Sequence, residues 1–276
     1  MARLFLKYFV AAIAALSAAA TLATALFDLQ CITSNWVYGA IGAVAVVVLG
    51  VWYACWQTKS KKEIVLDLAS ELKLTISEGD LFEKKGIICI PFNEYFDTHV
   101  GDNVIAENSV HGQFITKYYE DRLGELQQKI DEGLARKQCK THARRLDYCP
   151  NKQYDLGTYV DVRDGENTYV LFALTHFDDH DMANVGRTEY TRVVNTLMEH
   201  LNEIAADKPV YMPLFGVKYS RMRRTSQRIL LQLVNTIDFN DTCTIPGGVH
   251  IVVDSLDKLN VNLTTLEHVI KNGISK

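Results

Sequence analysis

Residues 74–81 read Leu-Thr-Ile-Ser-Glu-Gly-Asp-Leu, so that an apolar, strand-like stretch at 72–77 runs into a Gly-Asp-Leu turn. A second apolar run, Gly-Ile-Ile-Cys-Ile-Pro-Phe at 86–92, is too short for a stable helix and stops at Asn93. Both runs are typical of buried strands that end in loops. Around the first of them, residues 63–72 predict a preceding helix.

Strands and helices alternate along the rest of this region. Residues 154–162 and 168–175 predict a hairpin around the Asp164-Gly165 turn, and residues 187–206 predict an amphipathic helix. The remaining elements expected are a strand at 209–215, a helix at 220–237, a strand at 250–253 and a helix at 263–272. This order predicts an α/β fold in which helices cover a mixed sheet, and ligands of such sheets bind at the carboxyl ends of strands.

Residues 115–150 form an insertion in this alternation. A helical pattern from Ile115 to Leu134 is followed by a crowd of basic residues: Arg136, Lys137, Lys140, Arg144 and Arg145. Cys139, His142 and Cys149 offer three ligands, one fewer than a structural zinc site needs. We therefore interpret this stretch as a solvated basic insertion and expect no metal.

The charge balance argues against nucleic acid as a partner. The chain of 276 residues carries 29 basic and 33 acidic side chains, a formal charge of −4. Residues 1–62 hold five of the basic residues and one of the acids, so residues 63–276 hold 24 basic and 32 acidic side chains, a formal −8. A general nucleic-acid binder needs the opposite sign, because contacts to phosphate supply most of its affinity.

Two long apolar segments precede the strands and helices. Residues 8–27 and 36–56 contain no charged side chain. About 20 helical residues at ~1.5 Å each span the ~30 Å hydrocarbon core of a bilayer. The residues between the segments, 28–35, are enough only for a tight connection. The sequence thus predicts a transmembrane hairpin with helices at about 8–27 and 36–56.

Flanking charges predict the orientation of this hairpin. The 28–35 loop has no Lys or Arg, whereas basic residues lie before the first segment and after the second: Arg3, Lys7, Lys59, Lys61 and Lys62. The positive-inside rule then places both ends in the cytoplasm. We expect a multi-pass protein of the inner membrane with a hairpin at 1–58, a basic linker at 59–62 and a cytoplasmic domain at 63–276.

Two features of the hairpin have alternative interpretations. The first segment resembles a signal peptide, but its apolar run of about 20 residues exceeds the usual ~7–15. Small residues on one face of each segment allow close helix contact: Ala11, Ala15, Ala19, Ala23, Gly39 and Ala43. We favour packing of the hairpin on itself, and self-association of several hairpins is the alternative.

The Gly-Asp-Leu turn resembles the opening of a macrodomain. In that family the Asp accepts a hydrogen bond from the adenine amino group and the next backbone amide donates to the ring. The resemblance assigns these contacts to Asp80 and Leu81. The next strand of a macrodomain ends in an Asn near the distal ribose, and Asn93 takes that position. A helix cap is the alternative interpretation of Asp80, and we favour adenine recognition.

Two phosphate loops follow in a macrodomain, and residues 109–113 and 212–220 resemble them in placement. Gly216, after a buried strand, suits the close approach of a diphosphate. Four cations at the predicted start of the next helix would add positive charge: Lys218, Arg221, Arg223 and Arg224. The ligand-binding residues expected are Asp80, Leu81, Asn93, Ser109, His111, Gly112, Gln113, Leu214, Phe215, Gly216, Val217, Lys218, Tyr219, Ser220 and Arg221.

The pair of spans joined to this domain, together with residues 90–98 and 108–113, resembles the membrane effector of type II Thoeris antiphage defence over essentially the whole chain. The resemblance implies that a partner TIR-domain enzyme makes an ADP-ribose signal from NAD, here a histidine conjugate. Binding of this signal would switch the spans to damage the membrane and kill or arrest the cell. We also expect self-association, and no cofactor besides the signalling ligand.

An enzymatic role is the main alternative. His176 and the run Asp178-Asp179-His180-Asp181 invite a catalytic interpretation, but polar residues after a strand are typical of a solvated connection. The chain offers no convincing pair of nucleophile and base, so we expect a binding domain rather than an enzyme. A membrane-tethered ADP-ribosyl hydrolase, or an anchor whose domain docks a protein, remains the alternative.

Overall fold

The computed structural model describes residues 2–27, 36–68, 71–102, 104–141, 149–177, 183–217, 224–240 and 243–274. Contacts divide the chain into two compact units. The first holds residues 1–61 together with residues 262–276, and the second holds residues 62–261.

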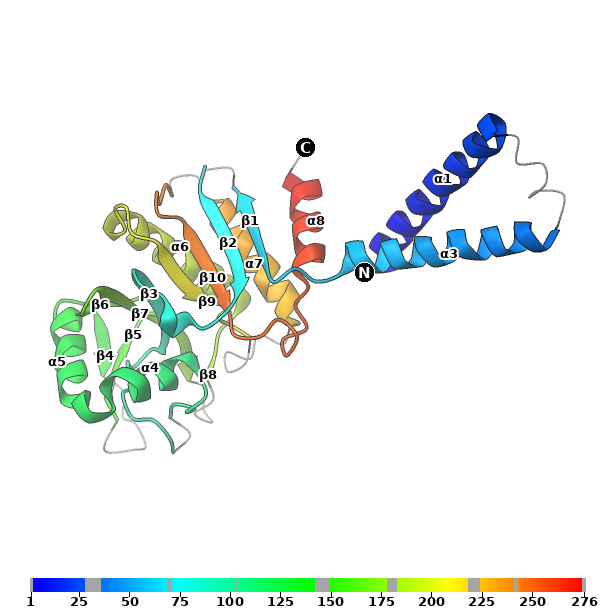
Figure 1. Ribbon diagram of the computed structural model, residues 1–276. Helices are drawn as coiled ribbons and strands as arrows, with labels where there is room; N and C mark the ends of the chain where they lie inside the picture. Colours follow the sequence, from blue (N-terminus) through cyan, green and yellow to red (C-terminus); the bar gives the residue numbers. More distant parts are fainter. Residues whose placement is uncertain are drawn as a thin grey trace. The chain divides into compact units, whose positions relative to one another are not determined.

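Three helices make up the described part of the first unit: α1 (Ala2–Phe27), α3 (Trp36–Thr58) and α8 (Leu263–Ile274) (Figure 1). Each of α1 and α3 contains a stretch that is long and apolar enough to cross a membrane, Leu4–Ala23 and Val37–Thr58. The two helices pack against each other through the buried residues Ala12 and Ala54. Gly50 belongs to the same contact, because a Cβ atom there would lie 3.2 Å from Cγ1 of Ile13.

The prediction that the row of small residues forms this helix contact is wrong. Ala11, Ala15 and Ala19 are exposed, and a Cβ atom added at Gly39 would meet nothing within 4 Å. The helices use the neighbouring face instead, where Gly50 allows closer approach than alanine would. The predicted row of small residues is therefore left uncovered by the helix pair.

The basic linker is held by α8. The hydroxyl of Thr264 donates a 2.6 Å hydrogen bond to the carbonyl oxygen of Lys59 and accepts one of 3.3 Å from the backbone N–H of Lys61. Nζ of Lys61 lies 2.6 Å from a carboxylate oxygen of Glu267. The chain that leaves α3 is thus fixed to α8 by backbone and side-chain contacts of residues 59–61.

An eight-stranded mixed sheet forms the centre of the second unit. Its spatial order is β1 (Glu63–Asp67), β2 (Lys73–Glu78), β10 (Val249–Val253), β9 (Val210–Pro213), β3 (Ile87–Asn93), β7 (Asn167–Phe177) and β6 (Tyr159–Asp164), and β8 (Ala183–Asn184) pairs with β7. The five strands from β2 to β7 are parallel, whereas β1 and β6 are antiparallel edges. The predicted mixed α/β fold and the predicted β6–β7 hairpin are confirmed.

The helix that we expected at residues 63–72 is wrong, because Glu63–Asp67 is strand β1. Ile64 and Leu66 are buried, while Glu63, Val65 and Asp67 are exposed. Burial that alternates with a period of two is the pattern of a half-buried edge strand, and the β-branched pair Ile64-Val65 favours it.

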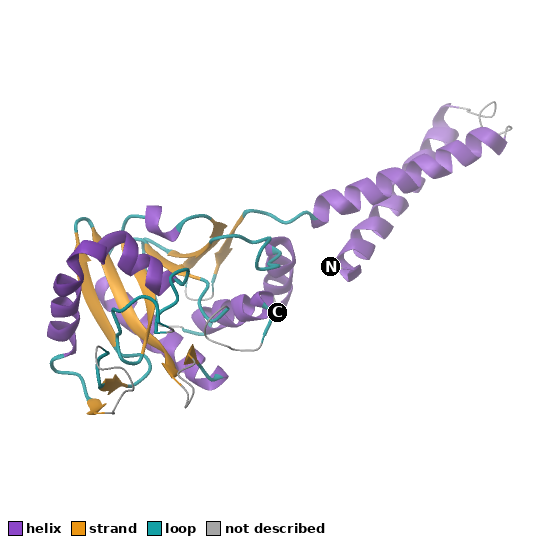
Figure 2. Ribbon diagram, turned by 90° about the horizontal axis from the view of Figure 1, so that it is seen from below, coloured by secondary structure: helices purple, strands orange, loops and turns teal. Residues whose placement is uncertain are grey.

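Helices cover both faces of the sheet (Figures 1 and 2). One face packs on α4 (Val110–Tyr119) and α5 (Leu123–Leu134), which the 3-10 turn η2 (Glu120–Arg122) separates. On the other face lie α6 (Arg187–Ile204) and α7 (Ser226–Asp238). We expected one helix from Ile115 to Leu134, and η2 breaks it. In the predicted insertion, β4 (Cys139–Thr141) pairs with β5 (Lys152–Tyr154), which follows the insertion directly.

The start of α7 also differs from the prediction. The predicted helix from Ser220 begins six residues later, at Ser226, so that Arg224 precedes the helix instead of belonging to it. Lys218, Arg221 and Arg223 lie outside the described residues, as do Asp178–Asp181 and His142.

Candidate ligand-binding site

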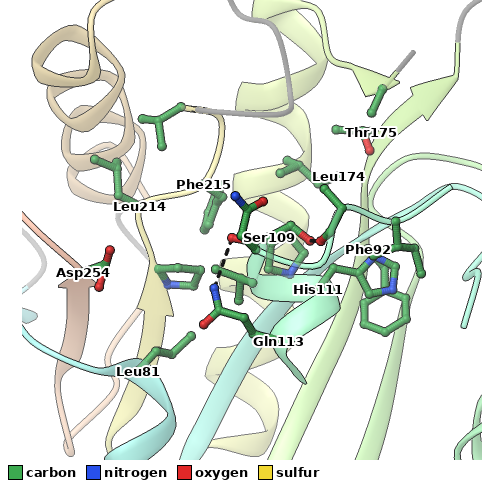
Figure 3. Close-up of a pocket in the computed structure, with 18 of the residues that line it drawn as sticks. Leu81, Phe92, Ser109, His111, Gln113, Leu174, Thr175, Leu214, Phe215 and Asp254 are labelled. Atoms are coloured by element: carbon green, nitrogen blue, oxygen red, sulfur yellow. Dashed lines mark hydrogen bonds between the residues drawn. The ribbon is translucent and has the colours of Figure 1, made fainter. Parts of the chain in front are cut away.

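A cavity of about 710 Å³ lies at the carboxyl edge of the parallel strands (Figure 3). Each of the five parallel strands supplies part of its lining: residues 79–81 after β2, Asn93 of β3, Thr175 of β7, residues 214–217 after β9 and Asp254 after β10. Parallel strands end at one edge of a sheet, which is why these distant segments meet. The volume is within the ~300–1,000 Å³ usual for small-molecule sites.

Most of the predicted ligand-binding residues come together here. Those in the cavity lining are Asp80, Leu81, Asn93, Ser109, His111, Gln113, Leu214, Phe215, Gly216 and Val217. Gly112 is buried in α4 outside the lining, where a Cβ atom would collide with the carbonyl oxygen of Ala106. Lys218, Tyr219, Ser220 and Arg221 lie outside the described residues.

Asp80 caps the 3-10 turn η1 (Leu81–Glu83) that follows β2. Its Oδ1 accepts a 2.8 Å hydrogen bond from the backbone N–H of Phe82. Its Oδ2 lies 3.5 Å from Nζ of Lys117 on α4, and the Asp80 side chain is 45% exposed. The capping interpretation is therefore correct, but it uses one oxygen only. The second oxygen remains accessible to a donor in the cavity.

Asn93 is held in a tight turn at the end of β3. Its Oδ1 accepts hydrogen bonds from the backbone N–H groups of Tyr95 and Asp97, at 3.0 and 3.3 Å. Its Nδ2 donates at 3.0 Å to the carboxylate of Asp97, which has no exposed surface. An amide has two donor hydrogens, so one remains for the cavity.

The segment 109–113 is the start of a helix rather than a loop. Ser109 is the N-cap of α4, and its hydroxyl accepts a 2.9 Å hydrogen bond from the N–H of Gly112. Gln113 is tied to the same turn, since its Nε2 donates to the carbonyl oxygen of Asn108 at 3.1 Å (Figure 3). A helix N-terminus that opens into a cavity favours anions. The segment thus keeps the chemistry expected of a phosphate loop with a different backbone.

His111 occupies the first turn of α4 and is buried. Its Nε2 lies 3.0 Å from the carbonyl oxygen of Asp97, so this nitrogen carries the proton and donates. The ring centroids of His111 and Phe92 are 3.6 Å apart. Burial lowers the pKa of His111 to about 3, although the bond to Asp97 opposes the shift. The imidazole is therefore neutral at physiological pH and cannot act as a cation there.

Gly216 turns the chain after β9 with a φ of +92°. Side chains other than glycine rarely adopt this conformation. The turn directs Leu214 and Phe215 toward the cavity, opposite Ser109 and His111 (Figure 3). The hydroxyl of Tyr190 on α6 donates to the carbonyl oxygen of Phe215 at 3.3 Å and so supports this turn.

Sequence reasoning missed the carboxylates of the lining. Asp102, Glu107 and Asp254 join Asp80 there, and the described lining contains no Lys or Arg. Asp254 directly follows a parallel strand. It could have been found from the rule that ligands of such sheets bind at the carboxyl ends of the strands. Asp102 and Glu107 lie in a connection without such a signal. Among the described residues no group of three or more metal-type ligands occurs.

Comparison with known proteins identifies the family. The model of a family described as Thoeris protein ThsA, Macro domain, matches residues 74–254, which is more than half of the chain. The chain belongs to this family. The ThsA match is supported by a Thoeris protein ThsA of Bacillus amyloliquefaciens (strain Y2), which is 28% identical over 213 residues, covering 73% of this chain and 69% of that protein.

Solved structures show the same fold for the ThsA macro domain. A mutant of the Oceanobacillus iheyensis macrodomain with ADPR has a TM-score of 0.52 at 12% identity, covering 76% of this chain and 99% of that chain. The same macrodomain with ADP has a TM-score of 0.53 at 10% identity, covering 76% and 97%. The macrodomain fold expected from the Gly-Asp-Leu turn is confirmed.

Proposed function

We propose that this ThsA-family protein is a membrane effector of antiphage defence whose macro-like domain binds an ADP-ribose-derived signal. The single observation that carries the proposal is the cavity at the carboxyl edge, where Asp80, Asn93, Gly216 and the start of α4 converge. Asp80 Oδ2 and the N–H of Leu81 are the groups for adenine. Gly216 and the α4 N-terminus are the groups for the diphosphate.

The absence of Lys and Arg from the described lining fits backbone recognition of the phosphates. Backbone N–H groups carry partial positive charge without the entropy cost of a long side chain. The ADPR and ADP in the Oceanobacillus macrodomain structures support a ligand of this class, because the fold is shared.

Acidic residues support a cationic group at the far end of the ligand. Asp102 and Glu107 line the cavity next to the α4 N-cap, and Oδ2 of Asp102 already lies 3.0 Å from Nε2 of His99. An amino or imidazolium group would find partners there. Histidine-ADP-ribose, made from NAD by a partner TIR-domain enzyme, carries such a group, and we propose it as the signal.

The proposed role is binding without turnover. His111 is neutral and donates to a backbone carbonyl, while the carboxylate of Asp97 is buried and engaged with Asn93. Neither group is free to activate water. Turnover of an ADP-ribosylated substrate that is lost on changing Asn93 would instead establish the hydrolase alternative.

The N-terminal helices are proposed to act on the inner membrane, with the macro-like domain in the cytoplasm. The linker enters the second unit at Lys62, whose carbonyl oxygen accepts a 2.9 Å hydrogen bond from the N–H of Glu78. Nζ of Lys62 also lies 3.1 Å from the carboxylate of Glu78, two residues before Asp80. Ligand at Asp80 would thus act close to the linker, and self-association of occupied domains would bring the helix pairs together.

Calorimetric titration of the full chain in lipid nanodiscs tests ligand binding. We expect saturable heats with ADP-ribose and tighter binding of its histidine conjugate. Equal and negligible heats for both compounds would contradict the proposal, and weak binding of both in the Asp80→Ala variant would locate the site.

A further inference from the structure

A second cavity, of about 630 Å³, lies in the groove between α6 and α7 and shares no lining residue with the first. Three arginines line it: Arg187 at the start of α6, Arg224 just before α7, and Arg228 in the first turn of α7. Nε2 of Gln232 joins the two helices across the groove, 3.2 Å from the hydroxyl of Thr191 and 3.5 Å from the carbonyl oxygen of Arg187. The walls of the groove are therefore fixed relative to each other.

The guanidinium groups of the three arginines have no ion-pair partner in the part of the chain that the structure describes. No carboxylate occurs among the described residues that line the groove, and none of the ion pairs among described residues involves Arg187, Arg224 or Arg228. Each of these residues is exposed. This gathering is unusual in a region that carries eight more acidic than basic side chains, 32 against 24.

The placement of the arginines also opposes local helix electrostatics. The N-terminus of a helix is its positive end, so acidic residues are favoured there and basic residues are disfavoured. Arg187 is the first residue of α6, Arg228 lies in the first turn of α7, and that turn has no acidic residue. Departures from local preference concentrate at functional sites. The positive ends of two helices and three guanidinium groups meet in one groove.

We infer that the α6–α7 groove is a second binding site, for an anion that carries phosphate groups. A guanidinium group can donate two parallel hydrogen bonds to two oxygens of one phosphate. Asn195 and Asn235 offer further donors along the groove. Phe239, 83% exposed at the far end, provides an apolar surface for the rest of the ligand. The phosphate belongs either to a soluble molecule or to a lipid headgroup.

Inorganic pyrophosphate tests this site on the full chain in phosphatidylcholine nanodiscs. Calorimetry should give saturable binding that weakens at least ~10-fold in Arg187→Gln and Arg228→Gln, because each loses charge-assisted bonds to phosphate. Arg192→Gln is the matched control, since Arg192 is an exposed arginine of α6 outside the groove lining. It should bind pyrophosphate as the unmodified chain does, and all three variants should bind ADP-ribose equally.

Two further arms complete the test. Thermal unfolding of Arg228→Gln without ligand should be unchanged or shifted upward, because the substitution relieves repulsion between like charges. In discs that contain phosphatidylglycerol, weaker pyrophosphate binding identifies a lipid headgroup as the native ligand, and unchanged binding identifies a soluble one. No saturable binding, equal binding by Arg228→Gln and Arg192→Gln, or a parallel loss of ADP-ribose affinity would overturn the inference.

Discussion

Asn93 at the end of β3 donates a 3.0 Å hydrogen bond from Nδ2 to Oδ2 of Asp97, a carboxylate without exposed surface. The same Asn93 accepts two backbone N–H groups through Oδ1. Three of its bonds are therefore spent on the turn, and the direction of its last donor hydrogen is set by Asp97. Asn93, which resembles the ribose contact of macrodomains, is therefore held in place by the turn and has one hydrogen left to donate to a ligand.

Asp97→Ala should destabilise the domain and weaken ADP-ribose binding together. The substitution leaves Nδ2 of a buried Asn93 without its acceptor, at a cost of about 1–3 kcal/mol in unfolding free energy. Thermal unfolding and calorimetry measure the two effects. Asp207→Ala, at an exposed turn, is the control and should change neither. Unaltered affinity in a destabilised Asp97→Ala protein would show that Asn93 does not contact the ligand.

Asp80→Ala should reduce ADP-ribose affinity by about 10-fold or more, because it removes a charged acceptor for the adenine amino group. Lys117→Gln separates this effect from the ion pair with Oδ2 of Asp80. That pair is about half exposed and contributes little, so this second variant should keep its affinity within about twofold. Equal losses in both variants would mean that Asp80 acts through Lys117.

Gly216→Ala should weaken ligand binding because φ is +92° at this residue and the chain must approach the phosphates closely. Gly165→Ala is a matched control in the β6–β7 turn, with a φ of +59° and no atom within 4 Å of the added Cβ. Both variants should unfold at a lower temperature, because each substitution lowers the free energy of unfolding by about 1 kcal/mol. Only Gly216→Ala should lose affinity, and a shared loss would indicate a general strain effect.

His111 should make stability depend on pH. Burial lowers its pKa to about 3 in the folded protein, so protons bind more readily to the unfolded chain below its ordinary value of 6.5. The stability from the neutral ring is fully present above pH 6.5 and is lost as pH falls toward 3. Between pH 7 and pH 5 the loss is about 2 kcal/mol.

His111→Phe keeps an aromatic ring beside Phe92 and cannot titrate. Its stability should fall less than that of the unmodified chain between pH 7 and pH 5, as measured by chemical denaturation. Parallel pH dependence in the two proteins would show that His111 is protonated in the folded state.

The elements with a strong pattern could be predicted from the sequence. The aliphatic runs of β2, β3 and β9 and the Asp164-Gly165 turn each carry a local signal that tertiary structure does not override. Residues 63–72 carry a mixed signal. Ile64, Leu66 and Leu68 recur with the period of a strand, whereas Val65, Leu68 and Leu72 recur with the spacing of a helix face. Pairing with β2 decides the outcome, and a single sequence does not contain that information.

The candidate site could be predicted from the sequence only in part, for the same reason. Asp80, Asn93 and Gly216 follow strands, so the rule for carboxyl ends finds them. The role of Asp97 depends on the turn that it forms with Asn93. The arginines of the α6–α7 groove come together only because α6 packs against α7. Residues that act through tertiary neighbours leave no local pattern.

Dye release from vesicles that carry the full chain tests the central claim, a ligand-gated membrane effector, most directly. Histidine-ADP-ribose should cause release from vesicles with the unmodified protein, and Asp80→Ala should require about 10-fold more ligand. Vesicles without ligand should stay closed. Release that is absent with ligand, or equal with and without it, would contradict the claim.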